Sequence, residues 1–286
     1  MGVNKNSIYT IRYAAKHGVN FDHMVTIGRQ GCHKITGKEI KKRFPKEKQA
    51  EIIEYLTAEK TMYAEKIFQC FGAKKVDSID YSDYEQATII HDMNLPIGEN
   101  MKNKFSCVWD GGTLEHVFNF PTAIRNCMDM VQKDGHLILE TPANNFFGHG
   151  FYQFSPELFF SLLDKQNGFM DTKIFIQGEN KHWHEVVSPQ IIKRRVDLCC
   201  TQKAASMVVI SKKINDIPNI LSVFQSDYVN IWNETEKTKQ PTIPKILLLY
   251  KKLMPQKIRK FLSKPIEYLN HQKKIKQMYI PIDITN

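Results

Sequence analysis

The chain has 286 residues and an apolar fraction of 42%, enough for one large domain plus an appendage. No stretch of the sequence approaches the roughly 20 apolar residues of a membrane-spanning helix, and the first residues lack the apolar core of a signal peptide. We therefore expect a cytoplasmic protein. The formal charge of +10 is concentrated between Lys237 and Lys276, where 12 basic residues and one acidic residue give +11 and leave about −1 for the rest.

The six cysteines form no CxxC pair, and several lie in apolar runs, such as Cys107 in FSCVW. This pattern predicts reduced, buried thiols, because a zinc site requires ligands at closer spacing. We expect no metal site from the cysteines, and the sequence suggests no other metal ligands.

Strand-like and helix-like segments alternate along most of the chain. Helices are expected at 7–16, in the two halves of 36–72 that Pro45 divides, at 121–131 and at 155–166, where Ser155 is the expected cap. Seven short apolar runs read as strands: 23–27, 74–80, 87–92, 105–110, 135–141, 172–178 and 206–213. The alternation predicts an α/β, Rossmann-like fold, with a mostly parallel seven-stranded sheet and helices on both faces.

The same pattern divides the chain into two parts. Residues 1–214 carry all seven predicted strands and are expected to form the Rossmann-like domain. From about Asn215 the strand pattern stops, and a polar segment leads into a run of Lys, Arg, Ile and Leu. Residues 215–286 are therefore expected to be a linker and a basic, amphipathic helical tail.

The predicted strands end in residues suited to a nucleoside ligand. In an open α/β sheet the ligand lies beyond the carboxyl ends of the strands. The first strand ends in a glycine turn, from Gly28 to Gly31, that lets the backbone approach a ligand. Asp80 is placed to accept from ribose hydroxyls and Asp92 from an adenine amino group, and Asp110 ends a third strand. The alternative is a solvated turn or cap at Asp80 and a local turn at Asp92.

The segment 105–142 resembles the central block of the class I S-adenosylmethionine-dependent methyltransferases, and especially their small-molecule branch. A Leu-Glu-His run at 114–116 and a Lys-Asp-Gly run at 133–135 match that block, with His136 where a second glycine is usual. Upstream, Asp80, Asp92 and the Leu-Pro pair at 95–96 fit the family's pattern. The resemblance spans about residues 21 to 212. It implies a cofactor, S-adenosyl-L-methionine, bound by Gly28, Gln30, Gly31, Asp80, Asp92 and Asp110.

The first loop departs from the family's pattern of an acidic residue followed by Gly-x-Gly-x-Gly. Thr26 replaces the acid, which removes a partner for the amino group of the cofactor. Gln30 stands where the second glycine is usual, and its side chain narrows the approach to the methionine part. The long segment between the first and second strands is a further departure, expected to be a lid or an insertion.

The loop after the fifth strand is expected to hold the acceptor. Residues 142–154 are dense in Asn, His, Gly and aromatic side chains, more than a buried core alone explains. For a hydroxyl acceptor a base is needed, and His149 and His116 are the candidate catalytic residues. For His116 the alternative is a structural role beside Glu115, capping and supporting the helix that follows.

The resemblance implies methyl transfer to a small-molecule acceptor. The basic tail suits work at a cytoplasmic membrane surface, where envelope sugars are assembled, so a glycan-type acceptor such as an envelope sugar precursor is also a candidate. One alternative is a non-catalytic binding module that keeps the fold and has lost the cofactor through the altered first loop. A nicotinamide-dependent oxidoreductase is the other alternative, but it expects GxGxxG after the first strand, and GRQGCH lacks that motif.

Three roles remain open for the basic tail. It is either a solvated helix packed on the domain, or an interfacial helix that contacts the inner face of an anionic membrane, or a nucleic-acid contact. Nucleic acid ranks last, because the amino-methylases of nucleic acids carry Asn or Asp, then Pro-Pro and an aromatic residue where this chain has DGGT at 110–113.

Overall fold

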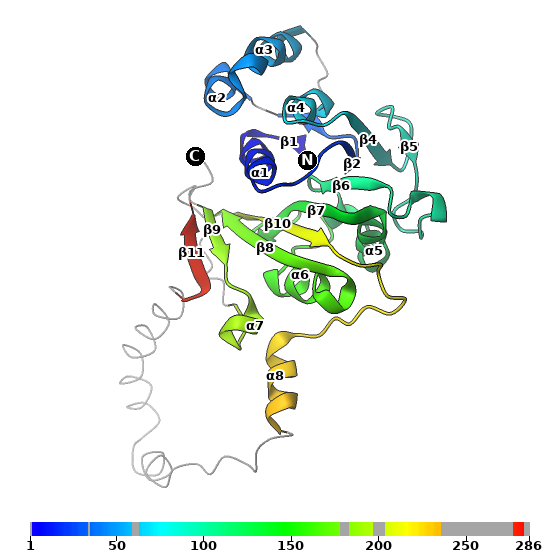
Figure 1. The fold of residues 1–286 in the computed structure, drawn as a ribbon, viewed down its shortest axis with the longest axis vertical. Helices are drawn as coiled ribbons and strands as arrows, with labels where there is room; N and C mark the ends of the chain where they lie inside the picture. The colour runs from blue at the N-terminus through cyan, green and yellow to red at the C-terminus, as the bar shows by residue number, and fades with distance from the viewer. Residues whose placement is uncertain are drawn as a thin grey trace.

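A central sheet organises the computed structural model, which describes residues 2–33, 35–58, 63–177, 183–196, 204–235 and 277–282. Within these residues the sheet has nine strands in the order β11-β9-β8-β10-β7-β6-β2-β4-β5 (Figure 1). The strand bounds are β2 His23–Ile27, β4 Lys75–Asp80, β5 Ile89–Ile90, β6 Phe105–Asp110, β7 Val131–Asn144, β8 Phe169–Gln177, β9 Trp183–Val186, β10 Ala205–Lys213 and β11 Tyr279–Ile282.

All seven predicted strands are present, but the predicted number of strands is wrong. Strands β9 and β11 extend the sheet beyond β8. Strands β5, β4, β2, β6 and β7 pair in parallel, while β10, β8, β9 and β11 each run antiparallel to their neighbours. The sheet is therefore mixed, with a parallel half that carries the expected Rossmann-like character and an antiparallel half that continues it.

The strand order locates the switch point of the sheet. If the seven predicted strands are numbered along the chain, their order is 3-2-1-4-5-7-6, the Rossmann order with one antiparallel strand inserted before the last. The chain leaves β2 toward β4 on one side and later returns to β6 on the other. The carboxyl ends of β2 and β6 therefore flank the crevice where an open α/β sheet binds its ligand.

Helices cover both faces of the sheet, as predicted (Figure 1). On one face lie α1 (Lys5–Lys16) and α4 (Glu65–Cys70), with α2 (Gly37–Arg43) and α3 (Gln49–Ala58) as a layer outside them. On the other face lie α5 (Phe120–Met130) and α6 (Pro156–Leu162). Two separate cores result, because successive strand residues point to opposite faces: Met24 joins the α1–α4 core and Val25 joins the α5–α6 core.

Local sequence signals explain where the two longest of these helices begin. The side chain of Asn4 accepts from the backbone N–H of Asn6, and Ser7 completes a capping box at the start of α1. Helix α5 follows Asn119 and has Pro121 in its first turn, where a missing N–H costs no hydrogen bond. Helix α6 begins after Ser155, as predicted, although within the described residues the Ser155 hydroxyl makes no capping hydrogen bond.

The segment between β2 and β4 forms a small layer of its own. It contains β3 (Gly31–Cys32), η1 (Lys46–Lys48) and helices α2 to α4, and β3 pairs in parallel with β1 (Gly2–Val3). The start of the chain thus lies against the loop that follows β2. Whether this segment acts as the predicted lid stays a prediction.

Further elements complete the described structure. They are η2 (Glu99–Met101), η3 (Leu114–His116), η4 (Lys165–Asn167), α7 (Pro189–Ile192) and α8 (Ser226–Thr235). Of the helices that the structure describes, none has the length and apolar character to cross a membrane. Most of the predicted basic tail, residues 236–276, lies outside the described residues, but β11 follows it and pairs antiparallel with β9.

Candidate functional site

The side chain of Gln30 fills the switch point. Gly28 ends β2 with a φ of 71°, a conformation that favours glycine, and the chain then turns so that Gln30 points back toward the sheet. Gln30 is buried, and its Nε2 donates to the carbonyl oxygen of Ile27 at 2.6 Å. Its Oε1 lies against Gly111, where a Cβ atom would clash with it. The carboxyl ends of β2 and β6 are therefore bridged by a side chain.

The Oε1 atom of Gln30 is a buried acceptor with no hydrogen-bond partner in the described part of the chain. Beside it, between the ends of β6 and β7 and the first residues of the chain, lies a cavity of about 60 Å³ lined by Gly111, Glu140, Thr141 and Phe146 among others. Ligand pockets are typically about 300–1,000 Å³, so this cavity alone is too small for a nucleoside.

Asp80 ends β4 and faces the loop after β2. Its Oδ1 accepts from the Tyr81 N–H at 2.7 Å, and its Oδ2 lies 3.4 Å from the N–H of Arg29. The guanidinium of Arg29 contacts Glu65 at 2.8 Å and stacks 3.8 Å from the ring centre of Tyr63. The loop is thereby fixed, and Asp80, which is only half-buried, keeps lone pairs for a further donor.

Asp92 follows β5 and forms a local turn. Such a turn is the alternative to the role in adenine binding that the sequence suggests. Its Oδ1 accepts from the backbone N–H of Asn94 at 2.9 Å and from the side-chain Nδ2 of Asn94 at 2.8 Å. These hydrogen bonds, with the backbone bond the larger cause, lower the pKa of Asp92. The second carboxylate oxygen, Oδ2, takes no part in this turn. A role of Asp92 in ligand binding therefore stays a prediction.

Asp110 lies at the end of β6 and is fully buried. Its Oδ1 accepts from the N–H groups of Thr113 at 2.9 Å and of Leu114 at 3.3 Å, which holds the turn before η3 in place. Among the described residues, Oδ2 has no hydrogen-bond partner. Burial raises the pKa of Asp110 to about 7, although the backbone donors favour its charged form.

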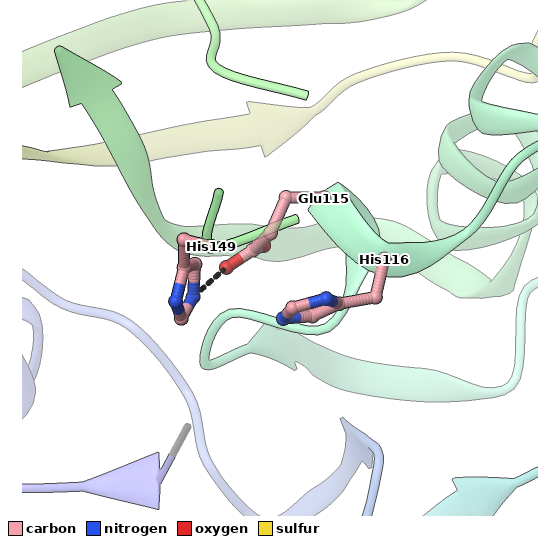
Figure 2. Close-up of side chains that lie close together, drawn as sticks. All are labelled: Glu115, His116 and His149. Atoms are coloured by element: carbon pink, nitrogen blue, oxygen red, sulfur yellow. Dashed lines mark ion pairs between the residues drawn. The ribbon is translucent and has the colours of Figure 1, made fainter. Parts of the chain in front are cut away.

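Glu115, His116 and His149 form a cluster beyond the ends of β6 and β7, which we call the Glu-His-His cluster (Figure 2). Glu115 and His116 are neighbours on η3, and His149 comes from the loop after β7. One ligand atom from each side chain lies within 4.8 Å of the others. His149 Nε2 is 3.5 Å from Glu115 Oε1, and the two imidazole rings are 5.0 Å apart at their centres.

Backbone contacts hold the His149 loop against η3. The carbonyl oxygen of Glu115 accepts from the N–H groups of Phe151 at 2.8 Å and Tyr152 at 3.2 Å. A Cβ atom at Gly150 would lie 2.9 Å from that oxygen and 3.2 Å from His116 Nδ1, so the close approach requires glycine. The Tyr152 hydroxyl donates to the Phe118 carbonyl at 2.6 Å. The sequence thus brings two distant loops together through one residue.

The electrostatics of the cluster centre on Glu115, which is completely buried. Burial, and secondly the nearby charge of Asp110, raise the pKa of Glu115 to about 8. Burial and the neighbouring His149 lower the pKa of His116. Within the described residues neither carboxylate oxygen of Glu115 accepts a hydrogen bond. The cluster therefore combines a carboxyl group that lacks a strong partner with two imidazoles, of which His149 is about one-third exposed.

Exposed aromatic side chains surround the cluster. Phe118 and Phe151, each two residues after a histidine of the cluster, are 74% and 67% exposed and contact each other edge to face. Phe147 is fully exposed on the same loop as His149. We call these three the phenylalanine rim. Apolar surface of this kind beside convergent polar groups is typical of a binding site.

The structure thus brings together the two predicted catalytic residues, His116 and His149, which are 33 positions apart in the sequence. It places Gly28, Gln30, Gly31 and Asp80 around the loop after β2, with Asp92 beyond the next strand. Sequence reasoning treated Glu115 only as a cap or support. The position of Glu115 directly before His116 and just after a strand end is a sequence signal for a functional role. The burial of its carboxylate, however, depends on contacts with the distant loop of His149.

Comparisons with known proteins give remote structural likeness. No family model and no curated protein matches the chain. The chain is similar to the structure of the MccD protein at 12% identity and a TM-score of 0.36, covering 73% of this chain and 98% of that one. It is similar to the N-methyltransferase NodS from Bradyrhizobium japonicum at 11% identity and a TM-score of 0.38, covering 74% and 96%.

A possible histamine N-methyltransferase from Thermotoga maritima shares 17% identity, with a TM-score of 0.33 over 72% of this chain and 89% of that one. At identities and TM-scores this low, the substrates and cofactors of these proteins say nothing about those of this chain. The strand order and the residues at the carboxyl edge of the sheet are therefore the features from which function is inferred.

Proposed function

We propose that the chain is an S-adenosylmethionine-dependent methyltransferase that acts on a small-molecule or glycan-type acceptor, with an envelope sugar precursor as a candidate. The observation that carries this proposal is the position of the Glu-His-His cluster. It lies at the carboxyl ends of β6 and β7, beside the switch point where an open α/β sheet binds its ligand. Acid–base side chains and strand-end carboxylates are thereby placed along one edge.

The nucleoside half of the cofactor fits the residues present. Asp80 is half-buried at the end of β4 and keeps acceptor capacity for ribose hydroxyls, and Asp92 keeps one oxygen for an adenine amino group. The methionine half fits only if the side chain of Gln30 leaves the crevice, because Gln30 now fills the space beside Gly111.

The proposed chemistry requires little of the protein beyond positioning and proton removal. The cofactor supplies an activated methyl group, so no further activation of the donor is needed. The chain holds the acceptor in line and excludes water. The acceptor proton passes to an imidazole of the Glu-His-His cluster, in which His116 is exposed and His149 is about one-third exposed, and Glu115 lies beside His149 and orients it.

The phenylalanine rim supports an acceptor with an apolar or sugar face. Phe118, Phe147 and Phe151 expose large apolar surfaces next to His149, and a ring or a sugar face can pack on them. A small polar group on the acceptor then reaches the cluster. Cytoplasmic work at a membrane surface is part of the same proposal, through the basic segment from Lys237 to Lys276.

Calorimetry with S-adenosylmethionine and with its demethylated product tests the proposal. We expect binding of both ligands, and tighter binding to Gln30→Gly than to the wild type, because the side chain no longer has to leave the crevice. Loss of one neutral hydrogen bond is worth about 1 kcal/mol, so the gain is expected to be about fivefold. Absence of heat with either ligand at millimolar concentration, in both proteins, would contradict the proposal.

A non-catalytic binding module is the second candidate, and the position of Gln30 is the observation that favours it. If Gln30 stays between the ends of β2 and β6, the crevice keeps only the small cavity beside Gly111. That candidate predicts no cofactor binding by the wild type and restored binding by Gln30→Gly. The same calorimetric pair therefore separates the two functions.

A further inference from the structure

We propose that Glu115, His116 and His149 bind a divalent transition-metal ion, such as Mn²⁺, Fe²⁺, Co²⁺ or Zn²⁺. Two imidazoles and one carboxylate on one side of an ion form a three-ligand set that leaves positions open for water or substrate. This inference concerns a binding site that the sequence did not predict, and it holds whether or not the chain transfers a methyl group.

The geometry of the cluster is close to what one ion requires. Two ligand atoms that each lie about 2.1 Å from the same ion are about 3.4 Å apart at the tetrahedral angle. The three ligand atoms of the cluster lie within 4.8 Å of one another, so the widest pair needs to close by at most about 1.4 Å. Side-chain rotations can supply this closure, because His149 sits on a loop and is about one-third exposed.

The buried carboxylate is the second observation. Glu115 has no exposed surface, and in the described part of the chain neither of its oxygens accepts a hydrogen bond. Its Oε1 lies 3.5 Å from the imidazole Nε2 of His149, a group that carries charge only when it is protonated. A buried carboxylate that is neither hydrogen-bonded nor firmly paired is costly, and a bound cation removes that cost. Figure 2 shows its carboxylate directed toward His149, with His116 alongside.

The surrounding structure fixes two of the ligands before any ion binds. Glu115 and His116 are consecutive on η3, whose preceding turn is held by the two backbone bonds to Asp110. The third ligand is brought in by the bonds from Phe151 and Tyr152 to the Glu115 carbonyl. A site whose ligands are held by backbone contacts is preorganised, which favours affinity.

The ligand set selects the class of ion. Magnesium and calcium prefer oxygen ligands, whereas imidazole nitrogen suits manganese, iron, cobalt and zinc. Glu115, His116 and His149 would hold the ion, and a bound ion would supply Lewis-acid polarisation of an acceptor oxygen if the proposed function is correct.

Cobalt titration of the chelator-treated, full-length protein tests the site. We expect one equivalent of Co²⁺ to bind, with visible absorption from imidazole coordination, and Mg²⁺ to bind at least tenfold more weakly. His149→Ala and His116→Ala should each lower the Co²⁺ affinity at least tenfold. His17→Ala is the matched control, because His17 is exposed and follows α1 at the opposite edge of the sheet, and it should bind Co²⁺ as the wild type does.

Equal Co²⁺ affinity of the wild type and His149→Ala, with both proteins shown to be folded by circular dichroism, would overturn the inference. So would the absence of stoichiometric binding at millimolar Co²⁺. Glu115→Gln keeps the volume of the buried side chain, so it should fold and lose affinity. Calorimetry with S-adenosylmethionine on the same metal-free preparation reports on the proposed function separately, because Asp80 and Gln30 are not members of the cluster.

Discussion

The acidic residues in the two halves of the carboxyl edge of the sheet differ in their burial and in their hydrogen bonds. In the outer half, at the ends of β4 and β5, Asp80 and Asp92 are half-buried and take hydrogen bonds from neighbours within their own turns. In the inner half, at the ends of β6 and β7, Asp110 and Glu115 are fully buried and retain unpaired oxygens in the described structure. The acids of the outer half are therefore accessible to a ligand. The acids of the inner half are buried, and a bound group would have to supply the hydrogen bonds or charge that their unpaired oxygens lack in the described structure.

The pKa shifts follow the same division. Hydrogen bonds from Asn94 lower the pKa of Asp92, while burial raises the pKa of Asp110 to about 7 and that of Glu115 to about 8. Groups whose charge is disfavoured by burial are frequent at functional sites, because catalysis and ion binding both use them. The inner half is therefore where chemistry is expected, and the outer half is where a cofactor is expected to be held.

Removal of His149 should have the largest effect. His149→Ala should lower the turnover number by about 10²- to 10⁴-fold, the usual consequence of losing an acid–base group, while leaving the affinity for S-adenosylmethionine unchanged. His91→Ala is the matched control, because His91 lies in the outer half and is exposed at its hydrogen bond to Leu95. Loss of cofactor affinity in His149→Ala would break the division between the halves.

Loss of Asp110 should destabilise the fold more than loss of Asp92. Asp110→Ala leaves the buried N–H groups of Thr113 and Leu114 unpaired, at about 1–3 kcal/mol each. Asp92→Ala removes only a partly exposed local turn, which is worth less than about 1 kcal/mol. Urea unfolding measures both. Asp110→Asn keeps the acceptor oxygen and should stay close to the wild type; a large loss in that variant would assign the stability to the carboxylate charge instead.

Asp80→Ala should weaken binding of the cofactor by about 1–3 kcal/mol, because it leaves ribose hydroxyls without an acceptor. Isothermal calorimetry measures the change. Asp83→Ala is the control, since Asp83 is exposed in the turn that follows the same strand. Equal effects of the two substitutions would mean that Asp80 is a solvated turn residue, which was the alternative interpretation of the sequence.

The smallest expected effect concerns pH and Glu140, near the end of β7. Burial raises the pKa of Glu140 above its ordinary value of 4.5, although the hydroxyls of Ser7 and Thr10 favour its charged form. The folded protein then holds this proton more tightly than the unfolded chain does. Its contribution to stability is therefore present at low pH and is lost as the pH rises through the folded pKa. Glu140→Gln should flatten the decline of the unfolding free energy above pH 4.5, measured by urea titration at several pH values.

Strands β2 and β6 in the parallel half could be predicted from sequence because each is a short, mostly apolar run that is almost wholly buried. Strand β9 and strand β11 could not. They lie at the edge of the sheet, and the YIPI of β11 is only partly buried, with Pro281 breaking the apolar pattern. Their pairing joins segments almost 100 residues apart, so no local signal specifies it.

The residues of the candidate site also differ in whether the sequence alone could identify them. Strand-end residues such as Gly28, Asp80 and Asp92 could be named from their places in the pattern. His116 and His149 were named separately, but their contact depends on Gly150 and on the bonds from Phe151 and Tyr152 to the Glu115 carbonyl. The burial of Glu115 follows from that docking. Tertiary contact, rather than spacing, therefore defines the cluster.

The pairing of β11 with β9 means that the basic segment is tethered at both ends. It begins after α8 and ends before Met278, which is fully buried. A chain ended at Glu236 would lose its concentrated charge and also one strand of the sheet, so the two effects could not be separated. The entropic cost of joining two fixed ends through a segment rises only slowly with the length of the segment. Replacement of individual lysines by glutamine within the intact segment changes its charge while keeping both ends joined to the domain, and anionic vesicles then report on charge alone.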